Sequence, residues 1–150
     1  MLKEWGNAYW DLFHTLSFKL KTNEKISELY NHFYILCSIL PCPICQEHAM
    51  KYLSKINKNN INTREKLIDL FFNFHNNVNY NLKKKQFTKD KYNNLYSSKK
   101  LVNVLNHFAI IYNKINNTST KLDLNLLTKK NFFKNFTIFL KSNKYLFELY

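Results

Sequence analysis

Glycine and proline are almost missing from this chain, and this shortage limits the folds it can adopt more than any other feature. Gly occurs once and Pro twice in 150 residues. Strands joined by hairpins need these residues at their turns, so a β-rich fold is disfavoured. Because 45% of the residues are hydrophobic, the chain can bury the core of one domain, or of one domain with an appendage. We therefore predict an all-α protein.

Apolar residues recur at helical spacing along most of the chain. Asn23 and Thr63 are expected to act as N-caps of the helices that follow them. The second helix has to end before Pro41, because a proline forces the preceding residue out of the α region. Helices are expected over about 4–21, 26–40, 63–82 and 89–115. Between the second and the fourth helix, a third one starts at the CPIC turn and ends in the polar stretch 55–62.

A second region is expected behind a linker at 116–121, which reads NNTSTK. Beyond it, aromatic and leucine residues form a helical stripe that ends near the C-terminus. Such a stripe is more often core than a cofactor site. We therefore expect residues 1–96 to form the functional core. Residues 97–150 are expected to be a helical extension that packs on this core or lies at a dimer interface.

The chain is strongly basic, with 23 Lys and Arg against 10 Asp and Glu and a formal net charge of +13. Such a charge attracts nucleic acids, acidic membranes, acidic partners or phosphorylated cofactors. The lysines are scattered apart from one run at 83–85, and no Arg-rich helix or aromatic RNA-binding signature is present. A solvated basic surface is therefore favoured over nucleic-acid binding.

No signal peptide or membrane-spanning segment is expected, because the N-terminus enters an amphipathic pattern at once and the most apolar run is short. The protein is therefore expected to be soluble and to stay on the cytosolic side. Three cysteines in that compartment favour a metal site or redox chemistry over a structural disulfide framework.

Two of these cysteines lie in the segment LPCPIC. Pro43 suits the first position of a helix, which puts Cys42 near the N-cap and Cys45 in the first turn. The positive end of the helix dipole at that place favours thiolates, which attack disulfides or bind zinc. A zinc site would use Cys42, Cys45 and His48, with Cys37 or His75 as fourth ligand. A thioredoxin-like fold is disfavoured, since it needs βαβ units.

Two further segments could hold a planar ring system beside these cysteines. Gly6, Trp10 and His14 are spaced by four, so one helix face presents a bare backbone, an indole and an imidazole. His75, Asn76 and Asn79 fall on one side of another helix, which is otherwise apolar. Buried polar groups of this kind need partners, although each residue taken alone could equally belong to the core or the surface.

In their order and spacing, WGxxxWxxxH, PCPxCxxH and HNxVNxxL, these segments resemble the FAD-linked sulfhydryl oxidases of the Erv/ALR type. The resemblance covers about residues 5–96 and is greatest to the small versions of large cytoplasmic DNA viruses. It implies a four-helix bundle with a short fifth helix, usually a homodimer, that binds FAD without a covalent bond. It also implies a cytoplasmic location in the host cell, with association with the virion as an option.

The resemblance assigns the active disulfide to Cys42 and Cys45. Lys84 matches a phosphate-facing lysine, although Lys83 and Lys85 stand where the family has Gly and Pro. Tyr96 stands where the family commonly has a Trp that stacks on adenine. The implied cofactor site comprises Gly6, Trp10, His14, Cys45, His48, Phe72, His75, Asn76, Val78, Asn79, Lys84 and Tyr96, with no metal.

The activity implied by the resemblance is the formation of disulfides in a thiol-containing relay or substrate protein. A partner thiolate would attack Cys42, and Cys45 would pass the electrons through FAD to oxygen, giving hydrogen peroxide. Cys37 has no internal partner and is expected to be a small buried residue. Two alternatives remain open, namely a zinc-binding helical module that contacts nucleic acid and a catalytically inactive scaffold of the same fold.

Overall fold

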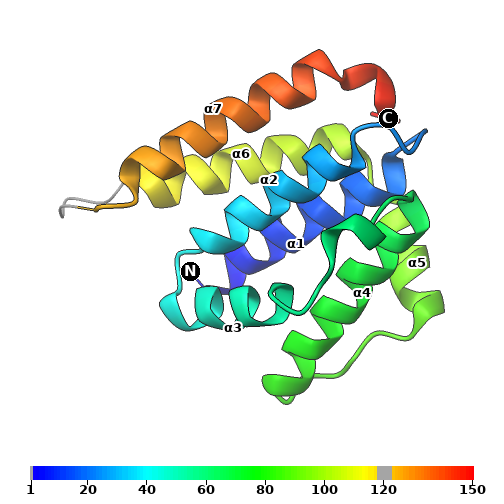
Figure 1. Cartoon of the computed structure of the whole chain (residues 1–150), viewed down its shortest axis with the longest axis horizontal. Coiled ribbons are helices and arrows are strands. Elements are labelled where there is room, and N and C mark those ends of the chain that lie inside the picture. Colours follow the sequence, from blue (N-terminus) through cyan, green and yellow to red (C-terminus); the bar gives the residue numbers. More distant parts are fainter. Residues whose placement is uncertain (1, 118–122) are drawn as a thin grey trace.

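The fold is all-helical, as predicted, in a computed structural model that describes residues 2–117 and 123–150 (Figure 1). Within these ranges there is no β-strand beyond one isolated bridge between Leu20 and Phe147. Two 3₁₀ turns cover Lys58–Asn60 and Lys144–Leu146. The α-helices are α1 (Leu2–Lys19), α2 (Ile26–Ser38), α3 (Pro43–Leu53), α4 (Arg64–Asn81), α5 (Lys89–Ser97), α6 (Leu101–Asn117) and α7 (Leu126–Ser142).

Helix α1 lies at the centre and packs against α4, α5 and α6, while α2 packs against α3, α4 and α7 (Figure 1). Their apolar faces form one core in which Leu12, Leu16 and Phe71 are completely buried. Burial of each such side chain contributes roughly 1.5–3 kcal/mol to folding. A smaller cluster joins Ile68 of α4 to Tyr92 and Tyr96 of α5. The four helices α1–α4 and the short α5 therefore hold the segments that carry the motifs.

Helix α4 begins as predicted, because the Thr63 hydroxyl accepts a hydrogen bond from the Lys66 N–H at 3.2 Å. The expectation that Asn23 caps α2 is wrong. Lys25 takes the N-cap position of α2 without a side-chain hydrogen bond. The Asn23 amide oxygen instead accepts the Arg64 N–H at 2.9 Å and so satisfies a free donor at the start of α4.

The single helix expected over 89–115 is two helices, because the chain turns at 98–100 between α5 and α6. No apolar residue occurs between Tyr96 and Leu101 that could keep this stretch against the core. The Ser98 hydroxyl bonds to the Leu95 carbonyl at 2.9 Å, as serines at helix ends commonly do. The change of direction lets Leu101 bury completely.

Helices α6 and α7 of the extension lie beside each other and cover α1 and α2 (Figure 1). Between α6 and α7, the Tyr112 ring stacks on Phe133 at 5.3 Å, and Phe108 meets Phe136 edge-on. The C-terminal segment is tied to the end of α1, where Lys21 N–H donates to the Leu146 carbonyl at 2.8 Å. Of the expected linker at 116–121, the first two residues belong to α6 and the rest lie outside the described residues.

In the part of the chain that the structure describes, no helix is long and apolar enough to cross a membrane.

Candidate active site

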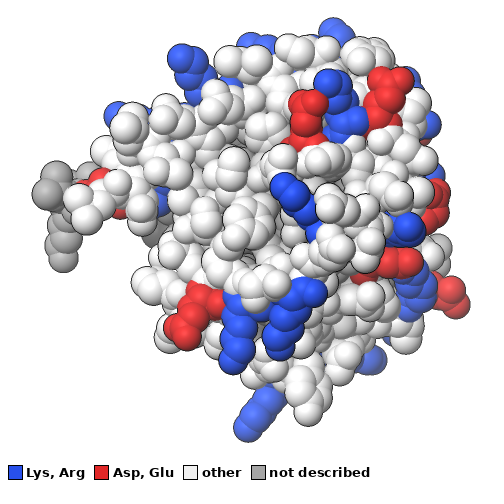
Figure 2. All heavy atoms as spheres, in the orientation of Figure 1, with Lys and Arg blue, Asp and Glu red and all other residues white. Residues whose placement is uncertain are grey.

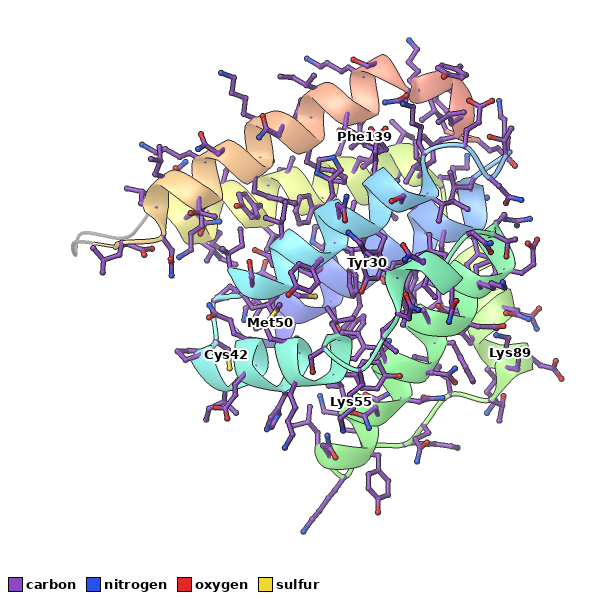
Figure 3. All side chains as sticks on the ribbon, viewed as in Figure 1. Tyr30, Cys42, Met50, Lys55, Lys89 and Phe139 are labelled. Atoms are coloured by element: carbon purple, nitrogen blue, oxygen red, sulfur yellow. The ribbon has the colours of Figure 1, made fainter. Side chains whose placement is uncertain are left out.

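Cys42 and Cys45 occupy the start of α3 as the sequence predicts. Figure 3 labels Cys42 at this end of the helix. Cys42 is the N-cap, and its Sγ accepts a hydrogen bond from the Cys45 N–H at 3.3 Å. Pro43 takes the first helical position, where its missing N–H costs nothing. Both thiols are free and half-buried, while Ile44 between them is exposed. The sulfurs are therefore held by the helix start and remain within reach of another molecule.

The two thiols have different acidities, which corrects the expectation that the helix start favours the thiolate of both. Hydrogen bonds from the Cys45 thiol and from the backbone N–H groups of Ile44 and Cys45 lower the pKa of Cys42. Burial raises the pKa of Cys45 to about 11, and the neighbouring Cys42 adds to this rise. In the reduced protein, the thiolate therefore resides on Cys42.

Phe74 of α4 connects the cysteine helix to the motif on α1. The Tyr52 ring of α3 stacks on Phe74 at 4.8 Å, and the Trp10 ring of α1 meets Phe74 edge-on at 5.2 Å. Cys45, Ala49 and Tyr52 are spaced along one face of α3. The cysteine pair and Trp10 therefore belong to one region of the molecule, where α1, α3 and α4 meet.

Trp10, His14 and His75 form a stack of three rings beside Phe74. The Trp10 and His75 rings are nearly parallel, with centroids 4.1 Å apart and planes 4° apart. His14 is completely buried, and its Nε2 lies 2.9 Å from His75 Nδ1. Burial and the charge of Lys84 lower the pKa of His75 to about 4, and burial together with the neighbouring His75 lowers the pKa of His14 well below its ordinary value. Both imidazoles are therefore neutral near pH 7.

Tyr92 of α5 meets this stack edge-on at His14, although it was not among the predicted cofactor residues. It is completely buried, and its hydroxyl is hydrogen-bonded to His14 Nδ1. The ring centroid of Tyr96, one turn later, lies 4.3 Å from that of His14. The one available signal was the spacing of two tyrosines by four residues, which puts both on one helix face.

The polar residues of α4 differ in what they can offer a ligand. The Asn76 amide is occupied, since it accepts the Phe87 N–H at 2.8 Å and donates to the Phe87 carbonyl at 3.0 Å. Asn79 is only 8% exposed, yet its side chain makes no hydrogen bond within the described residues. Asn79 lies one turn after His75, so an amide that has no hydrogen-bond partner in the described ranges, but is still reached by solvent, adjoins the ring stack.

The remaining predicted cofactor residues are more widely spread. A Cβ added to the half-buried Gly6 would meet nothing within 4 Å, so bare backbone faces open space one turn before Trp10. Val78 is half-buried against the main core, and Lys84 and His48 are exposed. Phe72 lies on the α5 side, where its ring contacts Tyr92 at 5.0 Å.

The ligands that a zinc site would need are not brought together. Among the described residues, no group of three or more His, Cys, Asp or Glu side chains could hold a metal ion. Cys37, one option for the fourth ligand, is buried in α2, and this burial raises its pKa. On the face that Figure 2 shows, Lys and Arg lie in small groups with Asp and Glu among them, so this face has no continuous basic surface that would favour nucleic acid.

Comparison with known proteins identifies the class to which this fold and site belong. The profile of the Erv1 / Alr family matches residues 7–97, which run from within α1 to the end of α5 and include Trp10, His14 and the other two motifs. The chain belongs to this family.

Several viral proteins are similar to the chain over the same part. An FAD-linked sulfhydryl oxidase of African swine fever virus is 36% identical over 95 residues, which are 61% of this chain and 79% of that protein. A candidate FAD-linked sulfhydryl oxidase of Invertebrate iridescent virus 3 is 33% identical over 88 residues, 56% of this chain and 60% of that protein. The match thus spans less than two thirds of the iridescent virus protein. No solved structure matches the chain.

Proposed function

We propose that this chain is an FAD-dependent thiol oxidase that forms disulfide bonds in a partner protein and passes the electrons to oxygen, giving hydrogen peroxide. One observation carries the proposal. The CxxC pair at the start of α3 adjoins, through Tyr52 and Phe74, the ring stack of Trp10 and His75. An exchangeable disulfide beside a site for a planar cofactor is the arrangement that such an oxidase needs.

The residues present fit FAD. Bare backbone at Gly6 and the half-buried Trp10 ring offer a surface for a flat ring system. The Asn79 amide makes no hydrogen bond within the described residues and is still reached by solvent, so it offers a donor and an acceptor. Lys84 offers a positive charge for a phosphate. In this proposal the cofactor is held by Gly6, Trp10, His14, Cys45, His48, Phe72, His75, Asn76, Val78, Asn79, Lys84 and Tyr96.

Cys42 and Cys45 carry out the thiol exchange. A partner thiolate attacks Cys42 in the Cys42–Cys45 disulfide, forms a mixed disulfide and releases Cys45 as a thiolate. A second partner thiol then displaces Cys42, so the partner is oxidised to a disulfide and both cysteines are reduced. Bound FAD would accept the two electrons from Cys45 and pass them to oxygen. Cys42 is the entry point because it is the N-cap of α3 and is less covered by the protein than Cys45.

The acidity of Cys45 sets a condition on this mechanism. Burial, together with the neighbouring Cys42, raises the pKa of Cys45 to about 11, and a thiol of high pKa is a poor leaving group. The site therefore has to stabilise the Cys45 thiolate by some other means when it is released. An electron-poor ring system beside Cys45 would supply that stabilisation, which gives the cofactor a role even before electrons move.

The wider setting of the enzyme is proposed from the family resemblance. The oxidised partner is a thiol-containing relay or substrate protein, and the enzyme works in the host cytoplasm as a homodimer. Residues 1–96 form the FAD-binding core, and residues 97–150 form an extension that supports it.

The absorption spectrum of the purified protein separates this function from its alternatives. An FAD-dependent oxidase purifies yellow, and heat releases FAD in about equal amount to protein. A zinc-binding module is colourless and contains metal, whereas an inactive scaffold is colourless and contains neither. A colourless protein that fails to bind added FAD would rule out the proposal.

A further inference from the structure

A buried chain of hydrogen bonds leads from Tyr92 through His14 to His75. The Tyr92 hydroxyl is bonded to His14 Nδ1, and His14 Nε2 lies 2.9 Å from His75 Nδ1. Tyr92 and His14 are completely buried, and His75 is 9% exposed. Each link joins two groups that can act as donor or acceptor, so the position of the protons decides what His75 presents to its surroundings.

The hydroxyl of Tyr92 fixes the direction of this chain. Burial raises the pKa of Tyr92, so the hydroxyl keeps its proton, and His14 Nδ1 is its one acceptor in the described part of the chain. If His14 carried its proton on Nδ1, the Tyr92 proton would be buried without a partner, which is unfavourable. The hydroxyl therefore donates to His14 Nδ1, and the neutral His14 ring carries its proton on Nε2.

The bond from His14 in turn fixes the proton of His75. The His14 Nε2–H donates to His75 Nδ1, which must then be unprotonated. Because His75 is neutral, its single proton resides on Nε2. That nitrogen makes no hydrogen bond to any residue of the described ranges. It belongs to the ring that stacks on Trp10, and Asn79 follows one turn later in α4.

We propose that Tyr92 is a positioning residue that acts through His14 to hold His75 in the Nε2–H tautomer. His75 is thereby a fixed hydrogen-bond donor at the Trp10 site, suited to an acceptor atom such as a ring carbonyl, a ring nitrogen or a phosphate oxygen. That this acceptor belongs to FAD rests on the proposed function. The tautomer itself is a property of this chain and does not.

Nitrogen NMR of the histidine rings tests the tautomer directly. The full-length protein is labelled with ¹⁵N-histidine, and two-bond ¹⁵N–¹H correlations at pH 7.5 show which nitrogen of each ring is protonated. Five histidines give five ring patterns. Gln substitution of His32, His48 and His107, one at a time, identifies the patterns of these three rings, so the two that remain belong to His14 and His75. We expect His14 and His75 both to be Nε2–H. A wild-type His75 that is protonated on Nδ1 would overturn the proposal without any variant.

Two matched variants separate positioning from packing. In Tyr92→Phe, every proton arrangement leaves one nitrogen of His14 unpaired, so we expect His75 to lose its single tautomer and become a mixture. Tyr96→Phe is the control, because Tyr96 packs on the same His14 ring but its hydroxyl makes no hydrogen bond within the described residues. Its tautomers should match the wild type. If Tyr92→Phe loses thermal stability but keeps both tautomers, Tyr92 is only a core residue and the proposal is wrong.

Titration with FAD tests the donor role. On binding, the His75 Nε2 resonance of the wild type should shift and its proton should become protected from exchange, while the tautomer stays the same. FAD that binds without moving this resonance would overturn the donor role. FAD that fails to bind would contradict the proposed function and leave the tautomer result intact.

Discussion

Cys42 and Cys45 are only three residues apart, yet the protein shifts their pKa values in opposite directions. Cys42 receives hydrogen bonds at the helix start, whereas Cys45 lies deeper and loses solvation. The difference follows from one helical turn, which points the second sulfur toward the core that Ala49 and Leu53 enter.

This difference predicts separate pH profiles for alkylation of the reduced protein. Iodoacetamide should modify Cys42 at a pH below the ordinary thiol pKa of about 8.5, because the lowered pKa leaves a thiolate there. Cys45 should react only as the pH approaches about 11. Peptide mass spectrometry after short exposures at each pH gives both profiles. A Cys45 that reacts at lower pH than Cys42 would contradict the assignment.

Cys37 is expected to be inert in the thiol chemistry. It is 5% exposed in α2, and burial raises its pKa, so it has neither thiolate character nor access. Cys37→Ser should keep the turnover of a small dithiol but lower the free energy of unfolding by about 1–3 kcal/mol, because a hydroxyl is buried in apolar surroundings. Urea denaturation and an oxygen electrode measure the two effects. Lost turnover in a variant of unchanged stability would make Cys37 a redox participant.

At the scale of elements, the end of α4 shows how this chain departs from its family's pattern. Lys83, which stands where the family often has Gly, adopts a left-handed φ of 55°. The following Lys84 N–H bonds to the Asn79 carbonyl at 2.8 Å, which closes the helix in the manner of a Schellman motif. The backbone thus keeps the turn that a glycine favours, at the cost of steric strain on a lysine.

Lys83→Gly should therefore stabilise the protein. Relief of the left-handed strain is partly offset by the greater freedom of glycine in the unfolded chain, which leaves a gain of roughly 0.5–1 kcal/mol. Chemical denaturation measures the change. Lys85→Gly is the matched control, since Lys85 has no positive φ, and it should be neutral or destabilising. A Lys83→Gly variant less stable than the wild type would refute this reading of the turn.

Helix positions were largely predictable from the sequence, because apolar spacing and the Thr63 cap are local signals. The break at 98–100 was missed since both flanking segments are periodic, and only packing on α1 decides that Leu101 must turn inward. Asn23 was assigned to the wrong helix because its true partner, Arg64, is 41 residues away. Tyr92 was missed for the same reason, as its partner His14 lies on another helix.

At the scale of the whole molecule, the extension is joined to the family core by a shared hydrophobic core. Phe132, Phe136 and Phe139 of α7 are buried, and the half-buried His32 of α2 contacts all three rings. Removal of α7 would therefore expose an apolar surface on the rest of the protein. Whether the extension also contributes to a dimer stays a prediction.

Truncation after Asn116 should therefore lower solubility or change the oligomeric state. Loss of three buried phenylalanines at roughly 1.5–3 kcal/mol each removes several kcal/mol of stability and exposes their partners. In the protein that remains folded, the flavin spectrum should change less than the solubility or the oligomeric state, because the proposed cofactor residues lie before Ser97. Light scattering with chromatography and thermal melting provide the measurements. A truncated protein with unchanged solubility, oligomeric state and melting temperature would refute this role.

The central claim is that Cys42 and Cys45 oxidise thiols at an FAD site, and turnover of dithiothreitol tests it most directly. Oxygen uptake and hydrogen peroxide are recorded for the purified wild type, Cys42→Ser and Cys45→Ser, each with its FAD content measured. We predict that the wild type releases one peroxide for each disulfide formed. Both variants should keep FAD but fall to the rate without enzyme. Near-normal turnover in either variant, or a wild type that binds FAD and consumes no oxygen, would contradict the account.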